Sequence, residues 1–243
     1  MATVQTADPA DSILDIIQRG HPRDGHPFVT LAYAQSLDGS LAARRGEPLV
    51  ISGLASQKLT HQLRASHSAI LVGIGTILAD DPQLNVRLVP GENPQPVILD
   101  SHLRTPRQAR VFQSLPPWIA GTLPIDPDRA AALEGCGSRL LVFPPQECGR
   151  VPLTMLLKHL RDLGVERLMV EGGAAVITAF LQADLVDLVV LTIAPILVGG
   201  QPAVEALLGE ERSLRRDFPV LGKMTASRVG DDLIVWGYPQ RSG

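Results

Sequence analysis

The sequence predicts an α/β fold: a mixed, mostly parallel central sheet with helices on both faces and an antiparallel hairpin at the C-terminus. Two observations carry this prediction. Between Asp126 and Pro195, short apolar runs alternate with helical patterns, which is typical of strand–helix–strand units in a parallel sheet. The tail over 223–238 instead predicts two strands around a Gly-Asp-Asp turn, and so tight a connection joins antiparallel strands.

The first part of the chain predicts an extension followed by a single large domain. Residues 1–26 are polar and punctuated by Asp-Pro, His-Pro and Gly, so we interpret them as an N-terminal extension that precedes a domain over 27–243. We expect one helix inside this extension, over 12–19. From Phe28 the texture changes, and "FVTLAYAQS" (28–36) predicts a strand that the turn "LDGS" closes.

The next part predicts helices with identifiable start signals between buried strands. Ser52 can cap a helix over about 53–66, which would place Leu59 and Leu63 on one face. Apolar runs predict the strands of this part, at 69–73, 96–101 and 118–122.

The second half gives the clearest helical pattern. Asp126-Pro127 opens a helix that extends to about Glu134. "PLTMLLKHLRDLG" (152–164) carries one apolar stripe, with Pro152 suited to the first turn and Gly164 to the C-terminal cap. The stripe consists of Leu153, Leu156, Leu157, Leu160 and Leu163. The remaining predicted elements are strands at 139–143, 167–171 and 187–195 and a helix at 174–183.

The composition fits a globular protein and argues against several classes of partner. Of the 243 residues 45% are hydrophobic and 4% aromatic, so the core must be mainly aliphatic. The net charge is −3 and no basic run is interleaved with aromatics, so we expect no nucleic-acid partner. The most apolar segment, "LVDLVVLTIAPILVGG", is cut by Asp187 and Pro195 and is too short for a membrane span.

The cysteines and the N-terminus predict a cytoplasmic protein. Cys136 and Cys148 are too few for a disulfide framework and match no usual zinc spacing, so we interpret them as structural thiols in a reducing compartment. The first residues are acidic and lack the apolar core of a secretory signal. No phosphate loop, nucleophile elbow, His-Glu-x-x-His or zinc-deaminase signature occurs, and we predict no metal site.

The strongest chemical signal is "VEGGAAVITAF" (170–180). A predicted strand ends in Glu171, two glycines follow, and a helix starts at once. A helix start exposes unpaired N–H groups and the positive end of the helix dipole, and glycines let a phosphate approach this backbone. Ligands of open α/β sheets bind at this end of the strands. The alternative is a tight turn with a solvated acid.

"GIGTILADDPQLNVR" (73–87) repeats this arrangement in a weaker form. The full glycine fingerprint is absent because Leu78 stands where the third glycine belongs. Asp80-Asp81-Pro82 favours a turn, although two adjacent carboxylates gain from a donor. Arg64 and Arg87 are candidate partners for these aspartates, or candidate anchors for a substrate phosphate.

Four segments, in this order and spacing, carry a resemblance: "AQSLDGSLA", "LRASHSAILVGIGTILADDPQLNVR", "PVILDS" and "EGGAAVITAFLQADLVDLVVLTIAPILVGG". They closely resemble the riboflavin-biosynthesis reductases, which include the C-terminal half of the bifunctional deaminase-reductase and the stand-alone diaminopyrimidine reductase. The likeness covers about residues 27–238, so the domain over 27–243 would be a reductase domain. It implies a dihydrofolate-reductase-like fold, NADPH as cofactor and a homodimer.

The resemblance also implies an activity and a set of contacts. The family reduces the ribosyl group of a pyrimidine ribosylamine 5′-phosphate to a ribityl group. The implied cofactor contacts are Ala34, Thr76, Asp80, Ser101 and the segment Gly173, Ala174, Ala175, Val176, Ile177, Thr178 and Ala179. The implied substrate contacts are Arg64, Leu84, Arg87 and Glu171, of which Glu171 is also the candidate catalytic residue.

One departure affects the choice of substrate. Bifunctional members carry Ser-x-Trp before the first helix, whereas this chain has Pro48, Leu49 and Val50, so neither contact transfers. This departure and the missing deaminase signature favour the stand-alone type, which reduces the 2,5-diamino pyrimidinone before deamination. Two alternatives remain: a reductase of this fold that acts on another substrate, such as a pterin or xenobiotic carbonyl, and a non-catalytic nucleotide-binding protein.

Overall fold

The computed structural model describes residues 3–4, 9–23, 25–44, 46–47, 49–146, 149–205 and 219–240. Two residues singled out in the sequence, Pro48 and Cys148, lie outside this part of the chain. Among the described residues, no helix has both the length and the apolar character needed to cross a membrane.

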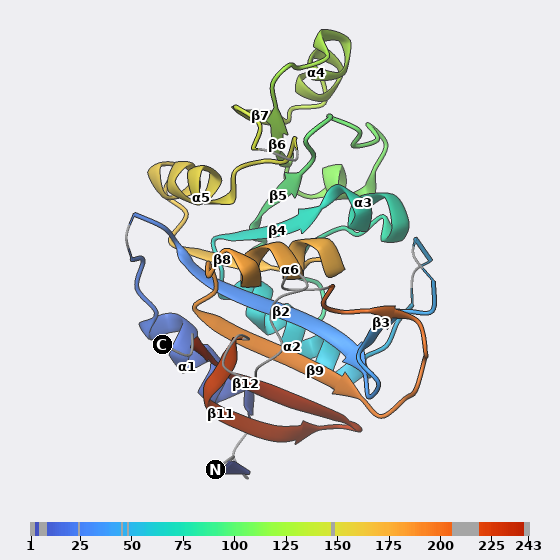
Figure 1. The fold of residues 1–243 in the computed structure, drawn as a ribbon, viewed down its shortest axis with the longest axis vertical. Helices are drawn as coiled ribbons and strands as arrows, with labels where there is room; N and C mark the ends of the chain where they lie inside the picture. The colour runs from blue at the N-terminus through green and yellow to red at the C-terminus, as the bar shows by residue number, and fades with distance from the viewer. Residues whose placement is uncertain are drawn as a thin grey trace, which may run out of the picture.

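A mixed ten-stranded sheet forms the centre of the described part, in the order β1-β11-β12-β9-β2-β8-β4-β5-β6-β7 (Figure 1). The strands are β1 (Thr3–Val4), β2 (Phe28–Ser36), β4 (Ala69–Gly73), β5 (Gln95–Leu99), β6 (Trp118–Thr122), β7 (Arg139–Phe143), β8 (Arg167–Val170), β9 (Leu188–Ala194), β11 (Val220–Val229) and β12 (Asp232–Gln240). The strands from β9 to β7 in this order pair in parallel, whereas β12 runs antiparallel to β9 and β11. Two short strands, β3 (Ser40–Ala42) and β10 (Gln201–Pro202), pair separately. The predicted mostly parallel sheet with its closing hairpin is confirmed.

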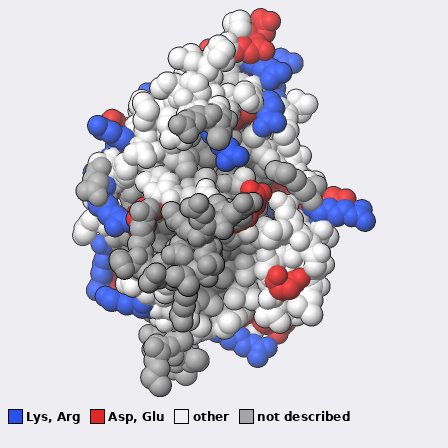
Figure 2. All heavy atoms as spheres, in the orientation of Figure 1, with Lys and Arg blue, Asp and Glu red and all other residues white. Residues whose placement is uncertain are grey.

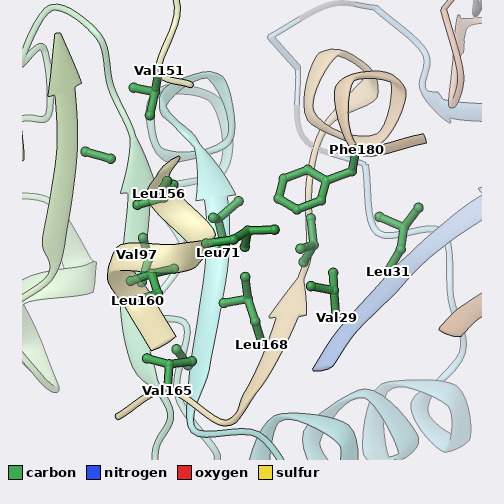
Figure 3. Close-up of a cluster of buried hydrophobic side chains, with 14 of the residues drawn as sticks. Val29, Leu31, Leu71, Val97, Val151, Leu156, Leu160, Val165, Leu168 and Phe180 are labelled. Atoms are coloured by element: carbon green, nitrogen blue, oxygen red, sulfur yellow. The ribbon is translucent and has the colours of Figure 1, made fainter. Parts of the chain in front are cut away.

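Alternate strand residues point to opposite sides of the sheet, and apolar side chains occur on both sides. Helices cover both faces. They are α1 (Pro9–Arg19), α2 (Leu54–Ala65), α3 (Ile74–Asp80), α4 (Pro127–Glu134), α5 (Leu153–Asp162) and α6 (Ala174–Gln182), with a short 3₁₀ turn at Arg110–Gln113. On one face, Figure 3 shows Leu156 of α5 and Phe180 of α6 in a cluster with Leu71 and Leu168 of the sheet. The other face carries α1 and α2 in one cluster and buried residues of α3 and α4 in a second.

The helix predicted near the N-terminus is present and belongs to this core. Ile13 and Ile17 of α1 are fully buried and join Phe28 and Leu59 in one cluster. The helix begins at Pro9, three residues before the predicted start. Residues 9–19 therefore complete the apolar layer over one face of the sheet.

Figure 2 shows basic and acidic side chains interspersed on the visible surface, without one continuous basic patch.

The predicted cap of α2 is wrong, and a distant residue explains why. The helix begins at Leu54, and the residue at its N-cap is Gly53, not Ser52. The Gly53 N–H donates to Asp232 Oδ2 at 2.8 Å, so a carboxylate from β12 binds the chain at the helix start. By contrast, Asp126 does cap α4 as expected, since its Oδ1 accepts from the N–H groups of Asp128 and Arg129.

The apolar segment over 185–200 contains β9, an inner strand of the sheet, and the residues that follow it. The sequence of this segment predicts a strand region able either to extend a sheet or to pack across a two-fold axis, but β9 is hydrogen-bonded on both edges, to β2 and to β12. It therefore has no free edge to offer. The apolar residues that follow it do reach the surface, with Leu197 76% exposed and Ile196 40% exposed.

His67, which follows α2, is a buried histidine whose protonation is coupled to folding. Its Nδ1 lies 2.6 Å from the Leu63 carbonyl oxygen and its Nε2 lies 2.8 Å from Thr30 Oγ1. Burial lowers the pKa of His67 to about 4, with the Leu63 contact opposing this shift and the charge of Arg167 adding to it. Because the folded-state pKa lies below the unfolded value of about 6.5, the folded state binds fewer protons than the unfolded state between about pH 6.5 and about pH 4.

We therefore predict that the folded protein loses stability as the pH falls from about 6.5 to about 4. For His67 alone this loss should approach roughly 2–3 kcal/mol, at 1.36 kcal/mol for each pKa unit. His67→Asn should be less stable at pH 7.5 but show a flatter dependence of melting temperature on pH. His102→Gln, at an exposed histidine, should keep the wild-type slope. An unchanged slope in His67→Asn would contradict the prediction.

Candidate functional site

A cleft of about 1590 Å³ lies at the carboxyl ends of the parallel strands. Its walls come from α2, from α6 and from the segments that follow β2, β4, β5, β7 and β8. Parallel strands bring all these segments to one edge of the sheet, which is where open α/β sheets bind ligands. The volume exceeds the roughly 300–1,000 Å³ of a pocket for one small molecule, so there is room for two ligands side by side.

The Gly172–Gly173 turn opens the middle of the cleft at the start of α6. Gly173 is the N-cap and has no side-chain cap, so the first N–H groups of the helix remain without a side-chain partner. A Cβ atom on Gly173 would meet Thr76 Oγ1 at an ordinary 3.7 Å, and one on Gly75 would meet nothing within 4 Å. Both glycines therefore face open space, as a cradle for a phosphate group requires.

The other two glycines of these turns serve packing. A Cβ on Gly73 would lie 2.8 Å from Val176, and one on Gly172 would lie 2.6 Å from the same side chain. The turns after β4 and β8 approach each other closely at Val176, and the absence of side chains at these two positions permits it.

Arg64 and Glu171 form a bidentate ion pair in the cleft. Arg64 Nε donates to Glu171 Oε1 and Nη2 donates to Oε2, both at 2.7 Å, and the side chains are 11% and 18% exposed. Arg64 Nη1 also donates to the Asn85 carbonyl oxygen at 3.1 Å. Burial opposes the charge on Arg64, but the Glu171 carboxylate and its hydrogen bonds raise the Arg64 pKa above its usual value. This geometry places Arg64 on Glu171 and not on the aspartates suggested as its partners.

Arg87 and His61 form the neighbouring wall. The Arg87 main-chain N–H donates to His61 Nδ1 at 3.1 Å, and Arg87 Nη1 donates to Asn85 Oδ1 at 3.0 Å. Burial, and then the charges of Arg64 and Arg87, lower the pKa of His61 to about 4. His61 is thus a cleft residue that the sequence reasoning missed. Its position three residues before Arg64, and therefore on the same helix face, is the signal that could have found it.

Most residues implied by the resemblance do line the cleft: Ala34, Arg64, Thr76, Asp80, Arg87, Ser101, Glu171, Gly173, Ala174, Ala175, Val176 and Ala179. Thr76 and Asp80 share one face of α3, as their spacing predicts, and burial raises the pKa of Asp80. Asp81 turns away, and its Oδ1 accepts from the Arg110 N–H at 2.8 Å.

Three of the implied residues do not line the cleft. The side chain of Leu84 is 2% exposed and belongs to the cluster under α3 and α4. Ile177 of α6 is fully buried, and Thr178 is buried with its Oγ1 accepting from the Glu205 N–H at 2.9 Å. Ile177 and Thr178 belong to the inner face of α6, and Leu84 packs below α3, so their side chains have no route to a ligand in the cleft.

The structure also adds residues that no motif predicted. His102 and Arg104 follow β5 and line the cleft, as does Arg150, which follows β7. Leu49 and Val50, which stand where the family pattern has x and Trp, line its exposed rim. Among the described residues, no group of three or more His, Cys, Asp or Glu side chains is placed to hold a metal ion.

This sheet, with a glycine turn at a helix start and an acidic residue directly after a strand, is typical of α/β proteins that bind nucleotide-like ligands. Comparison with known proteins is more specific. Residues 27–235 match the model of the RibD C-terminal domain, and the chain belongs to this family.

Named relatives agree with this assignment. The chain is 38% identical over 212 residues to the 2,5-diamino-6-ribosylamino-4(3H)-pyrimidinone 5′-phosphate reductase of Methanothermobacter thermautotrophicus. This match covers 86% of this chain and 96% of the relative. It is 34% identical to the riboflavin biosynthesis protein RibD of Aquifex aeolicus, but covers 57% of that longer protein. The chain thus spans nearly the whole of a stand-alone reductase and under two thirds of a RibD protein.

Solved structures support the fold. RibD of Acinetobacter baumannii superposes with a TM-score of 0.74 at 29% identity, over 90% of this chain and 59% of that one. A dihydrofolate reductase from Enterococcus faecalis, at 11% identity, a TM-score of 0.52 and 91% and 99% coverage, shares the fold alone. The chain is therefore an oxidoreductase of dihydrofolate-reductase-like fold, a class that uses a nicotinamide cofactor.

The open space at the start of α6 predicts that a larger side chain at Gly173 weakens cofactor binding. Gly173→Val places a branched side chain in the open space before the helix start, so we expect the affinity for NADPH to fall at least about tenfold by fluorescence titration. Gly53→Val is a matched control, because Gly53 is also an N-cap with nearly the same backbone angles and does not line the cleft. Equal affinities in the two variants would refute the cradle.

Proposed function

We propose that this protein catalyses the NADPH-dependent reduction of 2,5-diamino-6-ribosylamino-4(3H)-pyrimidinone 5′-phosphate, or of its deaminated form 5-amino-6-ribosylaminouracil 5′-phosphate, to the ribityl product in riboflavin biosynthesis. The observation that carries the proposal is the cleft itself. It holds an open glycine cradle beside the Arg64–Glu171 pair, in a chain that covers 96% of a reductase with this name.

The cleft divides into two halves along the sheet edge. The substrate half lies over β2 and β9 and under α2, with Ala32 and Val190 as its floor and Arg64, Arg87 and Glu171 as its polar groups. The cofactor half contains Thr76, Asp80 and the start of α6. The halves meet at Glu171–Gly173, where β8 ends. Two ligands bound there would therefore lie in contact.

In the proposed reaction the ring-opened ribosylamine takes up hydride at C1′ and a proton at the attached nitrogen. When bound, the nicotinamide cofactor supplies the hydride. The protein mainly aligns the two reactants, an effect that contributes roughly 7–11 kcal/mol when the geometry is favourable. Alignment is what the two adjoining halves of the cleft provide.

Glu171 and Arg87 have different roles in this proposal. Both Glu171 oxygens accept hydrogen bonds from Arg64, and each keeps a lone pair for N–H or O–H groups of the pyrimidine or ribose. Arg64 thus positions Glu171, which touches the substrate. Arg87 is exposed and its guanidinium has no carboxylate partner among the described residues, which makes it the better anchor for the 5′-phosphate.

Absorbance at the reduced nicotinamide band tests the function directly. Purified protein with NADPH should show loss of this absorbance with one or both pyrimidine phosphates, and the faster of the two is the preferred substrate. Oxidation with a pterin or a simple carbonyl compound alone would favour a reductase with another substrate. NADPH binding without oxidation by either pyrimidine would favour a nucleotide-binding protein.

Two arginines support NADPH over NADH. Adjacent strands lie about 4.8 Å apart, so Ser101 and Arg104 after β5 lie roughly 10 Å along the edge from the α6 cradle, and Arg150 after β7 roughly 19 Å. A dinucleotide with its nicotinamide at the substrate half and its diphosphate at α6 would extend its adenosine in this direction. Arg104 and Arg150 would then hold the 2′-phosphate that distinguishes NADPH.

This placement predicts a change in cofactor preference. Arg104→Gln combined with Arg150→Gln should lower the ratio of kcat/KM for NADPH to that for NADH by at least about tenfold, the loss of one or two charge-assisted contacts. Arg107→Gln should leave the ratio unchanged, because Arg107 is exposed nearby but does not line the cleft. A double variant with the wild-type ratio would exclude this end of the cleft as the 2′-phosphate site.

The proposal extends to assembly and location. Leu37, Ile196 and Leu197 lie together at the surface, since the Leu37 N–H donates to the Ile196 carbonyl oxygen, and all three are exposed. Asp38 fixes this patch by accepting from the N–H groups of Val198 and Gly199. We propose a homodimer that buries it. A cytoplasmic location is consistent with the free thiol of Cys136.

A further inference from the structure

His61 is a cleft residue to which neither the resemblance nor the proposed reaction gives a role. It lies on α2 and is 3% exposed. It lines the substrate half of the cleft together with Arg64 and Arg87. Its Nδ1 accepts the Arg87 main-chain N–H at 3.1 Å. A nitrogen that accepts a hydrogen bond carries no hydrogen, so the neutral ring must carry its hydrogen on Nε2.

The Nε2–H group of His61 is directed into the cleft. Among the described residues, the ring makes no hydrogen bond besides the one from Arg87, and Nε2 is not one of the solvent-inaccessible polar atoms that lack a partner. The nitrogen therefore reaches the space that the residue lines. His67 shows the opposite arrangement, since both of its ring nitrogens have partners inside the protein.

The charge of the ring is set by its neighbours. Burial, then the positive charges of Arg64 and Arg87, lower the His61 pKa, and the nearby Glu171 carboxylate opposes them only in part. At neutral pH the ring is an uncharged donor of one hydrogen bond, within the electrostatic influence of two arginines. A donor in such surroundings suits an oxygen with full or partial negative charge, and repels cations.

We propose that His61 binds the substrate directly, with Nε2–H donating to an acceptor oxygen next to Arg87, while Nδ1 holds the Arg87 main chain in place. The oxygen belongs to the 5′-phosphate or to the pyrimidine carbonyl. The identity of the substrate rests on the proposed function, but the open donor and its fixed tautomer rest on the hydrogen-bond geometry.

Two substitutions separate the ring nitrogens. His61→Asn places an amide near the position of Nδ1, so it can still accept from Arg87 but loses the donor in the cleft. His61→Gln reaches the position of Nε2 and restores an N–H donor there. Thr60→Val is the control, because Thr60 is the adjacent cleft residue on α2 and its hydroxyl donates within the helix, to the Ser56 carbonyl oxygen at 3.1 Å.

The measurement is binding of each pyrimidine phosphate by isothermal titration calorimetry, with KM values for substrate and NADPH alongside. We expect His61→Asn to weaken substrate affinity at least tenfold, with the KM for NADPH and the melting temperature as in Thr60→Val, and His61→Gln to recover at least threefold of the loss. With dephosphorylated substrate, the His61→Asn loss should vanish if the partner is phosphate and persist if it is the ring carbonyl.

Two results would overturn the proposal. One is wild-type substrate affinity in His61→Asn, and the other is an equal loss in both His61 variants for substrate and NADPH alike, which a merely structural role predicts. Because calorimetry needs no turnover, substrate binding that depends on His61 without any NADPH oxidation would reject the proposed function and keep this inference. Absence of substrate binding by the wild-type protein would reject both.

Discussion

Parallel pairing of the strands from β9 to β7 is the constraint on which the site depends. Because these strands run in one direction, the segments after β2, β4, β5, β7 and β8 must all emerge at the same edge. Residues far apart in sequence, from Ala34 to Arg150, therefore line one cleft. The antiparallel β12 reaches across to fix the start of α2 through Asp232, and so fixes the helix that carries His61 and Arg64.

The Arg64–Glu171 pair joins the two halves of that cleft. Arg64 comes from α2 on one face of the sheet, whereas Glu171 directly follows β8, next to the Gly173 turn. A carboxylate this little exposed needs a partner, and the bidentate guanidinium both satisfies it and fixes its direction. The same guanidinium bonds the Asn85 carbonyl oxygen, so the segment that carries Arg87 is held to the same point. The cleft therefore presents an already ordered polar surface at this point.

Local patterns in the sequence were sufficient for the strands and for the glycine turn at the start of α6. The strands at 28–36, 69–73 and 118–122 occur as predicted, because their apolar runs are bounded by clear turn signals. Contacts between distant residues could not be predicted in this way. Arg64 and Glu171 are 107 positions apart, and Gly53 and Asp232 are 179 apart, so neither the ion pair nor the true cap of α2 has a local signal. The resemblance supplied Leu84, and its burial shows that a family position does not by itself give a side-chain contact.

We propose that Arg64 and Glu171 act as one unit that presents a fixed carboxylate to the substrate. A double-mutant cycle in kcat/KM, with Arg64→Lys, Glu171→Gln and both together, tests it most directly. Lysine keeps the charge but not the two-pronged geometry, so each single variant should lose most of the activity that the pair supports. If the two residues act as one unit, the double variant should be little worse than either single one. Losses that multiply, as for independent residues, would contradict it.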